Sequence, residues 1–324
     1  MRILITGICG SGGSYLAEYL LKKNFKNISG IYRKLHSLNT FNTRYLIKNK
    51  KVKFFKCDLN NFNNVKLFFS KNKFDYIYHI ASDADVLKSF YNPRKLIINN
   101  NNCTLNLLEA LRLHRSKARI VICSTSEVYG NVSQNKQPIN EKNFINPINP
   151  YAVSKTFQDL LAQNYYAIYN MDIVITRMFT YFNARRDNLF ASAFAKQIVL
   201  IENNMQKVLK HGYLGSQRTF LDIRDAVNAY YLAAMKGKSG EIYNMGGKQK
   251  IKVGEILHKL IKLADIPIKL SKDKKLMRPK DINFQIPDSK KFIKHTNWKQ
   301  VYNLSQSLEY LLAEVREKYK YCLK

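Results

Sequence analysis

The chain has 324 residues, of which 46% are hydrophobic, and its formal net charge is +31. This hydrophobic content can form a sizeable core, which excludes global disorder, and no apolar run approaches the roughly 18 residues of a membrane-spanning helix. The positive charge is typical of nucleic-acid binders. However, the lysines are scattered over nearly every segment, so we expect compositional drift and no specific nucleic-acid partner.

Strand and helix patterns alternate through the first half of the chain. Strands are expected at residues 1–7, 28–33, 51–59, 74–82, 118–130 and 171–179, and helices at 13–24, 63–72, 93–114 and 150–170. This alternation predicts a parallel sheet that is covered by helices on both faces.

The second half is less regular. Residues 220–237 are expected to form the end of a strand followed by a helix. A further strand is expected at 241–247, and amphipathic helices are expected at 252–264 and 305–319. The predicted fold is a doubly wound α/β Rossmann domain with a smaller C-terminal substrate-binding lobe. The cofactor domain is placed at residues 1–177 with a returning segment near 217–247, and the lobe at 178–216 and 248–324.

A glycine-rich turn follows the first strand. Its spacing is G-x-x-G-x-x-G, with Gly7, Gly10 and Gly13 between a strand and a helix. Such a turn brings the backbone close to a pyrophosphate and points a helix N-terminus at the negative charge. We therefore predict a dinucleotide site here, although an ordinary tight connection would also use these glycines.

The ends of the next strands indicate the cofactor. Arg33 and Lys34 stand where an acidic residue would select against a 2′-phosphate, so NADP is favoured over NAD. Asp58, followed by Leu59, ends the third strand. Its carboxylate can accept a hydrogen bond from the adenine amino group, or it can belong to a turn or helix cap.

Tyr151 and Lys155 form a Y-x-x-x-K pair at the start of a helix. Residues four apart share a helix face, so we expect the ammonium to lower the pKa of the phenol and to bond the cofactor ribose. Thr125, at the end of a preceding strand, is expected to meet Tyr151 over the nicotinamide, because ligands of open α/β sheets bind at these strand ends.

These motifs resemble an extended short-chain dehydrogenase/reductase, and specifically the GDP-mannose 4,6-dehydratase family. The resemblance rests on six stretches: "TGICGSGGSYLAEYLL", "GIYRKLHSLNT", "STSEVYG", "PYAVSK", "ARRDNLF" and "RPKD". It implies that the cofactor contacts also include Ile8, Ser11, Gly12, Ala81 and Ser82. It also implies a homodimer or homotetramer, since the family often pairs subunits through a helical bundle.

The resemblance assigns a further catalytic group, Glu127, whose alternative role is that of a solvated loop residue. In the implied reaction, Tyr151 takes the proton of the sugar 4-hydroxyl while hydride leaves C4 for NADP. Glu127 then removes the C5 proton, water leaves from C6 and the hydride returns to C6, while Thr125 holds the 4-oxygen.

The implied substrate is a nucleotide-diphosphate sugar, with GDP suggested by the family alone. Guanidinium groups suit a diphosphate, and the residues at matching positions are Thr180, Asn183, Arg186, Arg218, Arg278 and Asp281. The chain departs from the family pattern at Thr180, where an asparagine is usual, at Cys103, which replaces a glycine, and at Gly12, which replaces an aspartate. Substrate orientation is therefore open.

Alternative functions remain at this stage. A nucleotide-sugar 4-epimerase or 4-reductase would explain Thr180, a uronate decarboxylase shares "TSEVYG", and a cofactor-sensing nucleic-acid-binding protein would use the positive charge.

The five cysteines, an odd number without a C-x-x-C pair, predict free thiols in a reducing cytoplasm and no metal site. No secretory signal is recognised at the start.

Overall fold

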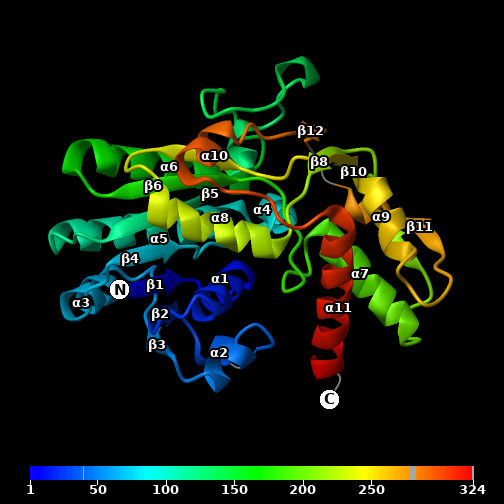
Figure 1. Cartoon of the computed structure of the whole chain (residues 1–324), viewed down its shortest axis with the longest axis horizontal. Coiled ribbons are helices and arrows are strands. Elements are labelled where there is room, and N and C mark those ends of the chain that lie inside the picture. Colours follow the sequence, from blue (N-terminus) through cyan, green and yellow to red (C-terminus); the bar gives the residue numbers. More distant parts are fainter. Residues whose placement is uncertain (39, 278–281, 323–324) are drawn as a thin grey trace.

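The computed structural model describes residues 1–38, 40–277 and 282–322. Its main element is a seven-stranded parallel sheet with the strand order β3-β2-β1-β4-β5-β6-β9 (Figure 1). The strands are β1 (Arg2–Thr6), β2 (Asn27–Tyr32), β3 (Val52–Lys56), β4 (Tyr76–His79), β5 (Arg119–Thr125), β6 (Ile173–Met178) and β9 (Ile242–Met245). The order reverses between β1 and β4, so a crevice opens where these strands end. The predicted doubly wound sheet is confirmed.

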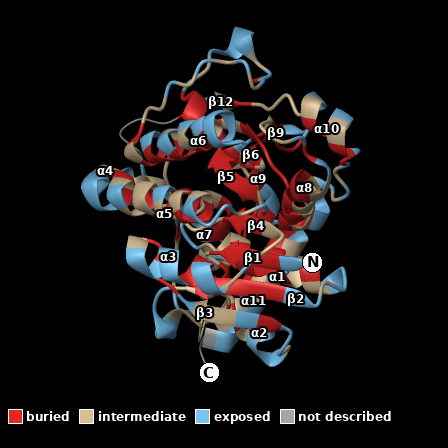
Figure 2. Ribbon diagram, turned by 90° about the vertical axis from the view of Figure 1, so that its left-hand side faces the viewer, coloured by how far each residue is buried: buried red, intermediate tan, exposed pale blue. Residues whose placement is uncertain are grey.

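Helices cover both faces of this sheet. One face carries α1 (Ser11–Lys22), α8 (Ile223–Lys236) and α10 (Lys290–Thr296), and the other carries α3 (Phe62–Lys71), α5 (Pro93–Leu113) and α6 (Pro150–Tyr169). Figure 2 shows the buried strands between these layers. The remaining helices near the sheet are the short α2 (Arg44–Lys48) and α4 (Val86–Tyr91).

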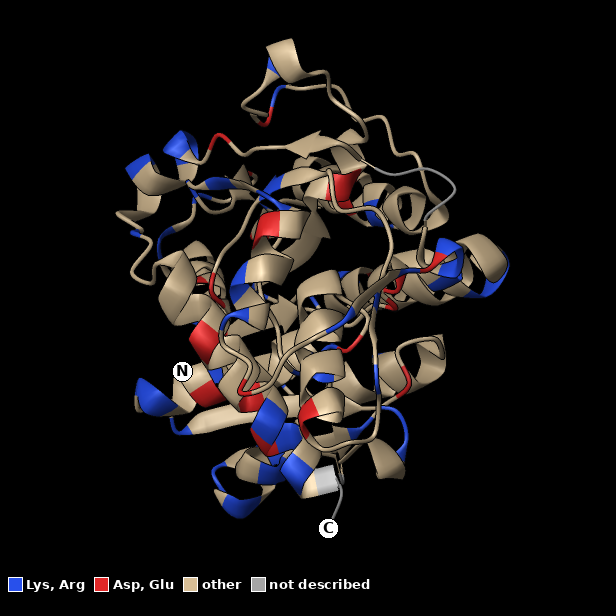
Figure 3. Cartoon of the chain, turned by 90° about the vertical axis from the view of Figure 1, so that its right-hand side faces the viewer, with Lys and Arg blue, Asp and Glu red and all other residues tan. Residues whose placement is uncertain are grey.

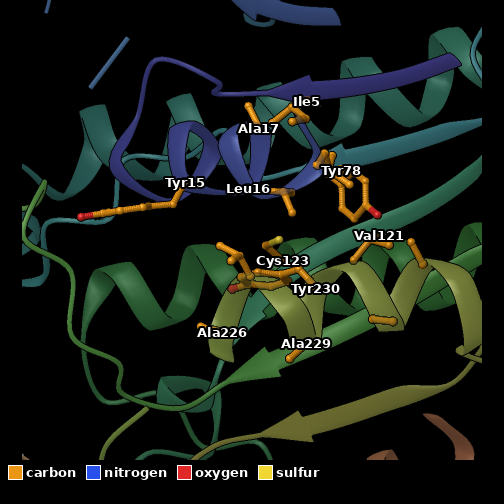
Figure 4. Close-up of a cluster of buried hydrophobic side chains, with 14 of the residues drawn as sticks. Ile5, Tyr15, Leu16, Ala17, Tyr78, Val121, Cys123, Ala226, Ala229 and Tyr230 are labelled. Atoms are coloured by element: carbon orange, nitrogen blue, oxygen red, sulfur yellow. The ribbon is translucent and has the colours of Figure 1, made fainter. Parts of the chain in front are cut away.

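The strands are apolar on both sides because each side packs on helices. In β1, Ile3 and Ile5 join the core beneath α1 and α8, whereas Leu4 joins the core beneath α3, α5 and α6. This is the period of two that a strand imposes. Figure 4 shows the first core, in which Tyr230 of α8 reaches across to Cys123 of β5.

A smaller lobe lies beside the main sheet, formed by segments before and after β9 (Figure 1). It contains a three-stranded sheet of β10 (Lys250–Lys252), β8 (Gln217–Thr219) and β12 (Phe284–Gln285), and a pair of β11 (Leu270–Lys272) and β7 (Leu209–His211). Its helices α7 (Phe190–Glu202), α9 (Val253–Ile261) and α11 (Leu304–Cys322) enclose a core of their own. The helix α7 was not expected from the sequence, and the exact domain boundaries stay a prediction.

The surface is basic throughout rather than in one place. Figure 3 shows lysine and arginine on helices and loops of both the main sheet and the lobe. Within residues 1–38, 40–277 and 282–322, no helix has the length and apolar character that a membrane span requires. The same residues contain no cluster of three potential metal ligands, and Cys9, Cys57, Cys103 and Cys123 are free thiols.

Candidate active site

The glycine turn between β1 and α1 is closed by the main chain. The N–H of Gly10 donates to the carbonyl of Gly7 at 2.9 Å. Gly7 has a φ of +70°, and a Cβ there would lie 2.9 Å from the backbone of Ala81; a Cβ on Gly13 would lie 2.4 Å from the Gly7 oxygen. Larger residues are therefore sterically excluded at Gly7 and Gly13. The turn leaves the first main-chain N–H groups of α1, from Ser11 onward, at the crevice.

The other predicted cofactor residues lie at the ends of neighbouring strands. Ile8 is fully buried and occupies the space that a side chain at Gly30 of β2 would need. Ala81 donates its N–H to the Thr6 hydroxyl at 3.2 Å. This hydrogen bond joins the residues that follow β4, Ala81 and Ser82, to the end of β1. The sheet order thus brings these residues to one edge.

Two of the predicted cofactor side chains that follow β2 and β3 already form hydrogen bonds within the protein. Arg33 and Lys34 are exposed after β2, and Arg33 donates to the Asn99 side chain at 3.3 Å. Asp58 accepts the N–H of Asn60 at 3.0 Å, so it does form a turn, while Leu59 is buried. Both roles considered for Asp58 are compatible with this turn, since a carboxylate accepts several hydrogen bonds.

Thr125, Glu127 and Tyr151 converge beyond the end of β5. Thr125 ends this strand and caps a short 3₁₀ turn, accepting the N–H of Glu127 at 3.3 Å. The Thr125 hydroxyl lies near the Tyr151 phenol and lowers its pKa. Asn149 caps α6 by accepting the N–H of Ala152 at 2.8 Å, and its amide donates to the Glu127 carboxylate at 2.9 Å. One capping residue therefore fixes the carboxylate beside the tyrosine.

The electrostatic state of Tyr151 differs from the prediction. Burial raises its pKa to about 12; the charge of Arg186 lowers the pKa, and that of Glu127 raises it. The net shift is thus opposite to the expected lowering of the Tyr151 pKa, and the ammonium of Lys155 donates to the carbonyl of Cys123 and to the amide oxygen of Gln158. Arg186 is the main cation that lowers the phenol pKa in this arrangement, and the effect of Lys155 on Tyr151 stays a prediction.

Lys155 belongs to a buried polar network that the sequence did not reveal. Burial lowers the pKa of Lys155 to about 8. Gln158, which accepts from it, donates to the carbonyl of Asn100 at 2.8 Å and to the Thr104 hydroxyl. That hydroxyl lies 2.8 Å from His79 Nε2.

The network ends at the glycine turn. His79 Nδ1 lies 2.9 Å from the hydroxyl of Thr6, the last residue of β1. Burial and the nearby Lys155 charge lower the pKa of His79 to about 3, so the ring is neutral. The only available sequence signal was position, since Gln158 lies one turn from Lys155 on the same helix.

A buried ion pair links β6, α6 and β5 next to Thr125. Arg177 of β6 donates to both carboxylate oxygens of Asp159, at 2.9 and 3.0 Å, and to the Tyr129 hydroxyl at 2.9 Å. Ser124 of β5 donates to the same carboxylate at 2.7 Å. The pair therefore ties α6 to the end of β5, next to Thr125.

The predicted substrate residues do not form one cluster through direct contacts. Arg186 donates to Asn188 at 2.9 Å and to the carbonyl of Ala84, beside the tyrosine. Arg218 lies on β8, is 8% exposed and donates to the carbonyl of Ile282. Arg278 and Asp281 lie outside the described residues.

Two more predicted substrate residues follow β6. The carbonyl of Thr180 accepts the N–H of Leu221 at 3.1 Å. Asn183 is fully buried and accepts the N–H of Arg185 at 3.1 Å. These contacts fix the segment that passes over the crevice, so Thr180 and Asn183 have a structural role at the least.

The same segment contains two residues that sequence reasoning missed. The hydroxyl of Tyr181 would lie 3.6 Å from a Cβ on Gly12, and this tyrosine also raises the pKa of Tyr151. Arg185 donates to Glu18 and to Ser14 of α1, both at 2.9 Å. Tyr181 thus lies near both the glycine turn and Tyr151, and Arg185 links the segment to α1.

Residues 4–311 match the family model described as GDP-mannose 4,6 dehydratase. The chain belongs to this family. The resemblance seen in the sequence motifs is thereby confirmed over nearly the full length.

Members of this family and its neighbours differ in their nucleotide and sugar. The chain is 31% identical over 274 residues to a dTDP-D-glucose 4,6-dehydratase of Dictyostelium discoideum, covering 81% of this chain but 62% of that protein. It is 30% identical over 278 residues to a GDP-mannose 4,6-dehydratase of Yersinia enterocolitica, covering 83% and 74% of the two chains. A GDP-6-deoxy-D-mannose reductase of Pseudomonas aeruginosa is 27% identical over 242 residues, covering 74% and 80%.

Solved structures share the fold of this family member over its whole length. A UDP-glucuronic acid 4-epimerase from Bacillus cereus, in complex with UDP-glucuronic acid and NAD, has a TM-score of 0.87 at 27% identity and covers 98% of this chain and 99% of its own. A dTDP-glucose 4,6-dehydratase from Streptomyces venezuelae with NAD has a TM-score of 0.88 at 21% identity, covering 99% and 98%. The second likeness concerns the fold alone.

Proposed function

We propose that the protein is a nucleotide-sugar 4,6-dehydratase that uses NADP and yields a 4-keto-6-deoxy sugar. The observation that carries this proposal is the Glu127 carboxylate, held by Asn149 beside Tyr151. A dehydratase needs a base for the C5 proton in addition to the groups that oxidise C4, and Glu127 supplies such a base.

The residues at the crevice fit a dinucleotide. A Cβ at Gly7 or Gly13 would fill the space that the turn keeps tight, and the helix N-terminus behind it suits a pyrophosphate. Ser11, Gly12, Ala81 and Ser82 border the same crevice. The bound nicotinamide accepts a hydride and returns it.

The protein groups supply position and proton transfer. Tyr151, as the phenolate, takes the proton of the 4-hydroxyl, and Thr125 holds the 4-oxygen. Glu127 takes the C5 proton, which the adjacent ketone has made acidic, and as its conjugate acid helps the C6 hydroxyl leave as water. Because the Tyr151 pKa is about 12 without ligands, the nearby cation of Arg186 is needed to favour the phenolate.

We assign NADP on the exposed pair Arg33 and Lys34, whose cations follow β2 and can meet a 2′-phosphate. The Pseudomonas reductase structure is in complex with NADPH, whereas the epimerase and dehydratase structures contain NAD.

The substrate assigned here is a GDP-linked hexose, on the strength of the family. Arg186 and Arg218 are the described guanidinium groups for the diphosphate, and Arg278 and Asp281 are proposed to contact the nucleotide. Other relatives are named for dTDP and UDP sugars, so the substrate panel includes all three nucleotides.

We further propose a homodimer formed by α5 and α6. Apolar side chains are exposed along both helices, at Ile98, Leu105, Val153, Phe157, Leu160 and Ile168. On α6 they recur at helical spacing and form one stripe, and Figure 2 shows the outer faces of these helices exposed to solvent. A second copy would cover this surface. The free thiols are consistent with a cytoplasmic location.

One experiment tests the proposed function. The purified protein is incubated with NADP and a panel of GDP-, dTDP- and UDP-hexoses, and each product is weighed by mass spectrometry. A dehydratase gives one product lighter by one water, without net reduction of NADP. A product of unchanged mass that chromatography separates from the substrate supports the alternative 4-epimerase, which Thr180 and the UDP-glucuronate 4-epimerase relative favour.

A further inference from the structure

A second cavity lies away from the catalytic residues. It has a volume of about 500 Å³ and is lined by residues within three segments, 134–138, 246–250 and 286–298. None of Thr125, Glu127, Tyr151 and Lys155 is among its lining residues. The volume lies within the range of about 300–1,000 Å³ that small-molecule sites occupy.

The three segments are held together by hydrogen bonds, so the cavity is formed in advance. The N–H of Ile286 donates to the Gln137 side chain at 2.9 Å, and that of Gly246 donates to the Ser289 hydroxyl at 3.3 Å. The N–H of Asp288 donates to the carbonyl of Ile139 at 2.7 Å. Such preorganisation reduces the cost of ordering a site on binding.

Strand β12 lies between the cavity lining and a contact to the turn that carries Glu127. The side chain of Gln285 donates to the carbonyl of Ser126 at 3.0 Å, next to Thr125 and Glu127. The following residue, Ile286, lies beyond the end of β12 and lines the cavity. The cavity therefore has a lining of its own, which includes neither Thr125 nor Glu127.

The lining combines cationic and apolar groups. Lys248, Lys250 and Lys290 contribute three ammonium groups, none of which has a carboxylate partner within 4.0 Å among the described residues, and Asp288 contributes the one carboxylate of the lining. The three lysines are exposed, so solvent and a bound anion can reach them.

The apolar part of the lining suits a ring. It consists of Pro138, Ile286, Pro287, Ile293 and Trp298, with Trp298 buried at the base. Gln134, Gln137 and Ser289 add polar groups between the two parts. We propose that this cavity binds a nucleoside monophosphate, with the phosphate at the lysines and the base against the apolar wall, separately from the catalytic crevice.

Trp298 makes the proposal directly measurable, because it is the chain's one tryptophan. Its selective excitation reports on this cavity, because Trp298 is one of the lining residues. Titration of the NADP-loaded protein with GMP should change the emission of Trp298 in a saturable way. Guanosine, which lacks the phosphate, should bind at least about tenfold more weakly, as expected when charge-assisted contacts are lost.

Paired variants separate a site from general charge attraction. Lys248→Gln/Lys290→Gln should weaken GMP binding by about tenfold or more, whereas Lys259→Gln/Lys262→Gln, which removes the same charge from α9, should leave it unchanged. The absence of a saturable response, or equal weakening in both double variants, would overturn the proposal. Thermal midpoints and sugar-product formation, measured on the same samples, show that folding and the proposed activity are independent of the outcome.

Discussion

The ammonium group of Lys155 donates to the amide oxygen of Gln158 and to the carbonyl of Cys123, rather than to the hydroxyl of Tyr151. The orientation of the Gln158 amide is fixed, because its nitrogen donates to the carbonyl of Asn100 and to the Thr104 hydroxyl. The amide oxygen must therefore face Lys155. Gln158 acts as a positioning residue that stabilises the charged form of a buried lysine.

Gln158 should set the alkaline limit of activity. The Lys155 pKa is lowered to about 8, so the ammonium is present below that pH and is lost as the pH rises through it. Gln158→Leu removes one charge-assisted acceptor, worth about 1.5–3 kcal/mol, and should move the decline of kcat/KM about one to two pH units lower. Gln158→Glu should move it higher. Identical pH profiles in both variants would reduce Gln158 to a structural role.

The sequence predicted those site residues that belong to a local pattern of spacing or periodicity. The glycine turn, the helix start at Tyr151 and the strand end at Thr125 follow from spacing and periodicity, and the sheet topology brings them to one edge. The partner of Lys155 could not be read in this way. It depends on α5 packing against α6 and on β4 ending beside both, which are contacts between segments far apart in the chain.

The lobe was harder to predict for the same reason. Helix α7 is largely apolar, and its buried residues include Phe194, Ile198 and Ile201 along with two alanines. Periodicity alone does not distinguish such a run from a buried strand. The short strands β8, β10 and β12 have two or three residues each and pair across long loops, so no local pattern marks them.

Arg186 should control ionisation of Tyr151. Its charge lowers the phenol pKa, so Arg186→Gln should raise that pKa and move the rising limb of kcat to higher pH, with a loss of about tenfold at neutral pH for each pH unit moved. Arg186→Lys should retain part of the effect. If Arg186 only anchors phosphate, KM will rise while the pH profile of kcat stays in place.

Glu127→Gln should separate oxidation at C4 from elimination. The variant loses the C5 base, so water loss should slow by about 10²–10⁴-fold, the usual contribution of a positioned acid–base group. Removing the Glu127 charge also removes one cause that raises the Tyr151 pKa, so oxidation at C4 should persist. Stopped-flow absorbance should then show reduced cofactor accumulating before product. Normal elimination would contradict the assigned base.

The cofactor preference should depend on Arg33 and Lys34. Arg33→Ala/Lys34→Ala should weaken NADP binding by about tenfold or more, because charge-assisted bonds to the 2′-phosphate are lost, and should change NAD binding little. Lys53→Ala/Lys56→Ala on β3 removes the same charge as a control. Equal weakening of both cofactors would show that Arg33 and Lys34 do not recognise the 2′-phosphate.

The stripe on α6 should determine assembly. Phe157 and Leu160 are 36% and 51% exposed and lie on one helix face. A glutamate at each position would place two charges in an apolar interface, which is costly without a partner charge, so Phe157→Glu/Leu160→Glu should convert a dimer into a monomer in analytical ultracentrifugation. Met205→Glu, at a 57% exposed site beyond α7, provides the control. A monomeric wild-type protein, or a dimer that survives the double change, would remove α5 and α6 as the interface.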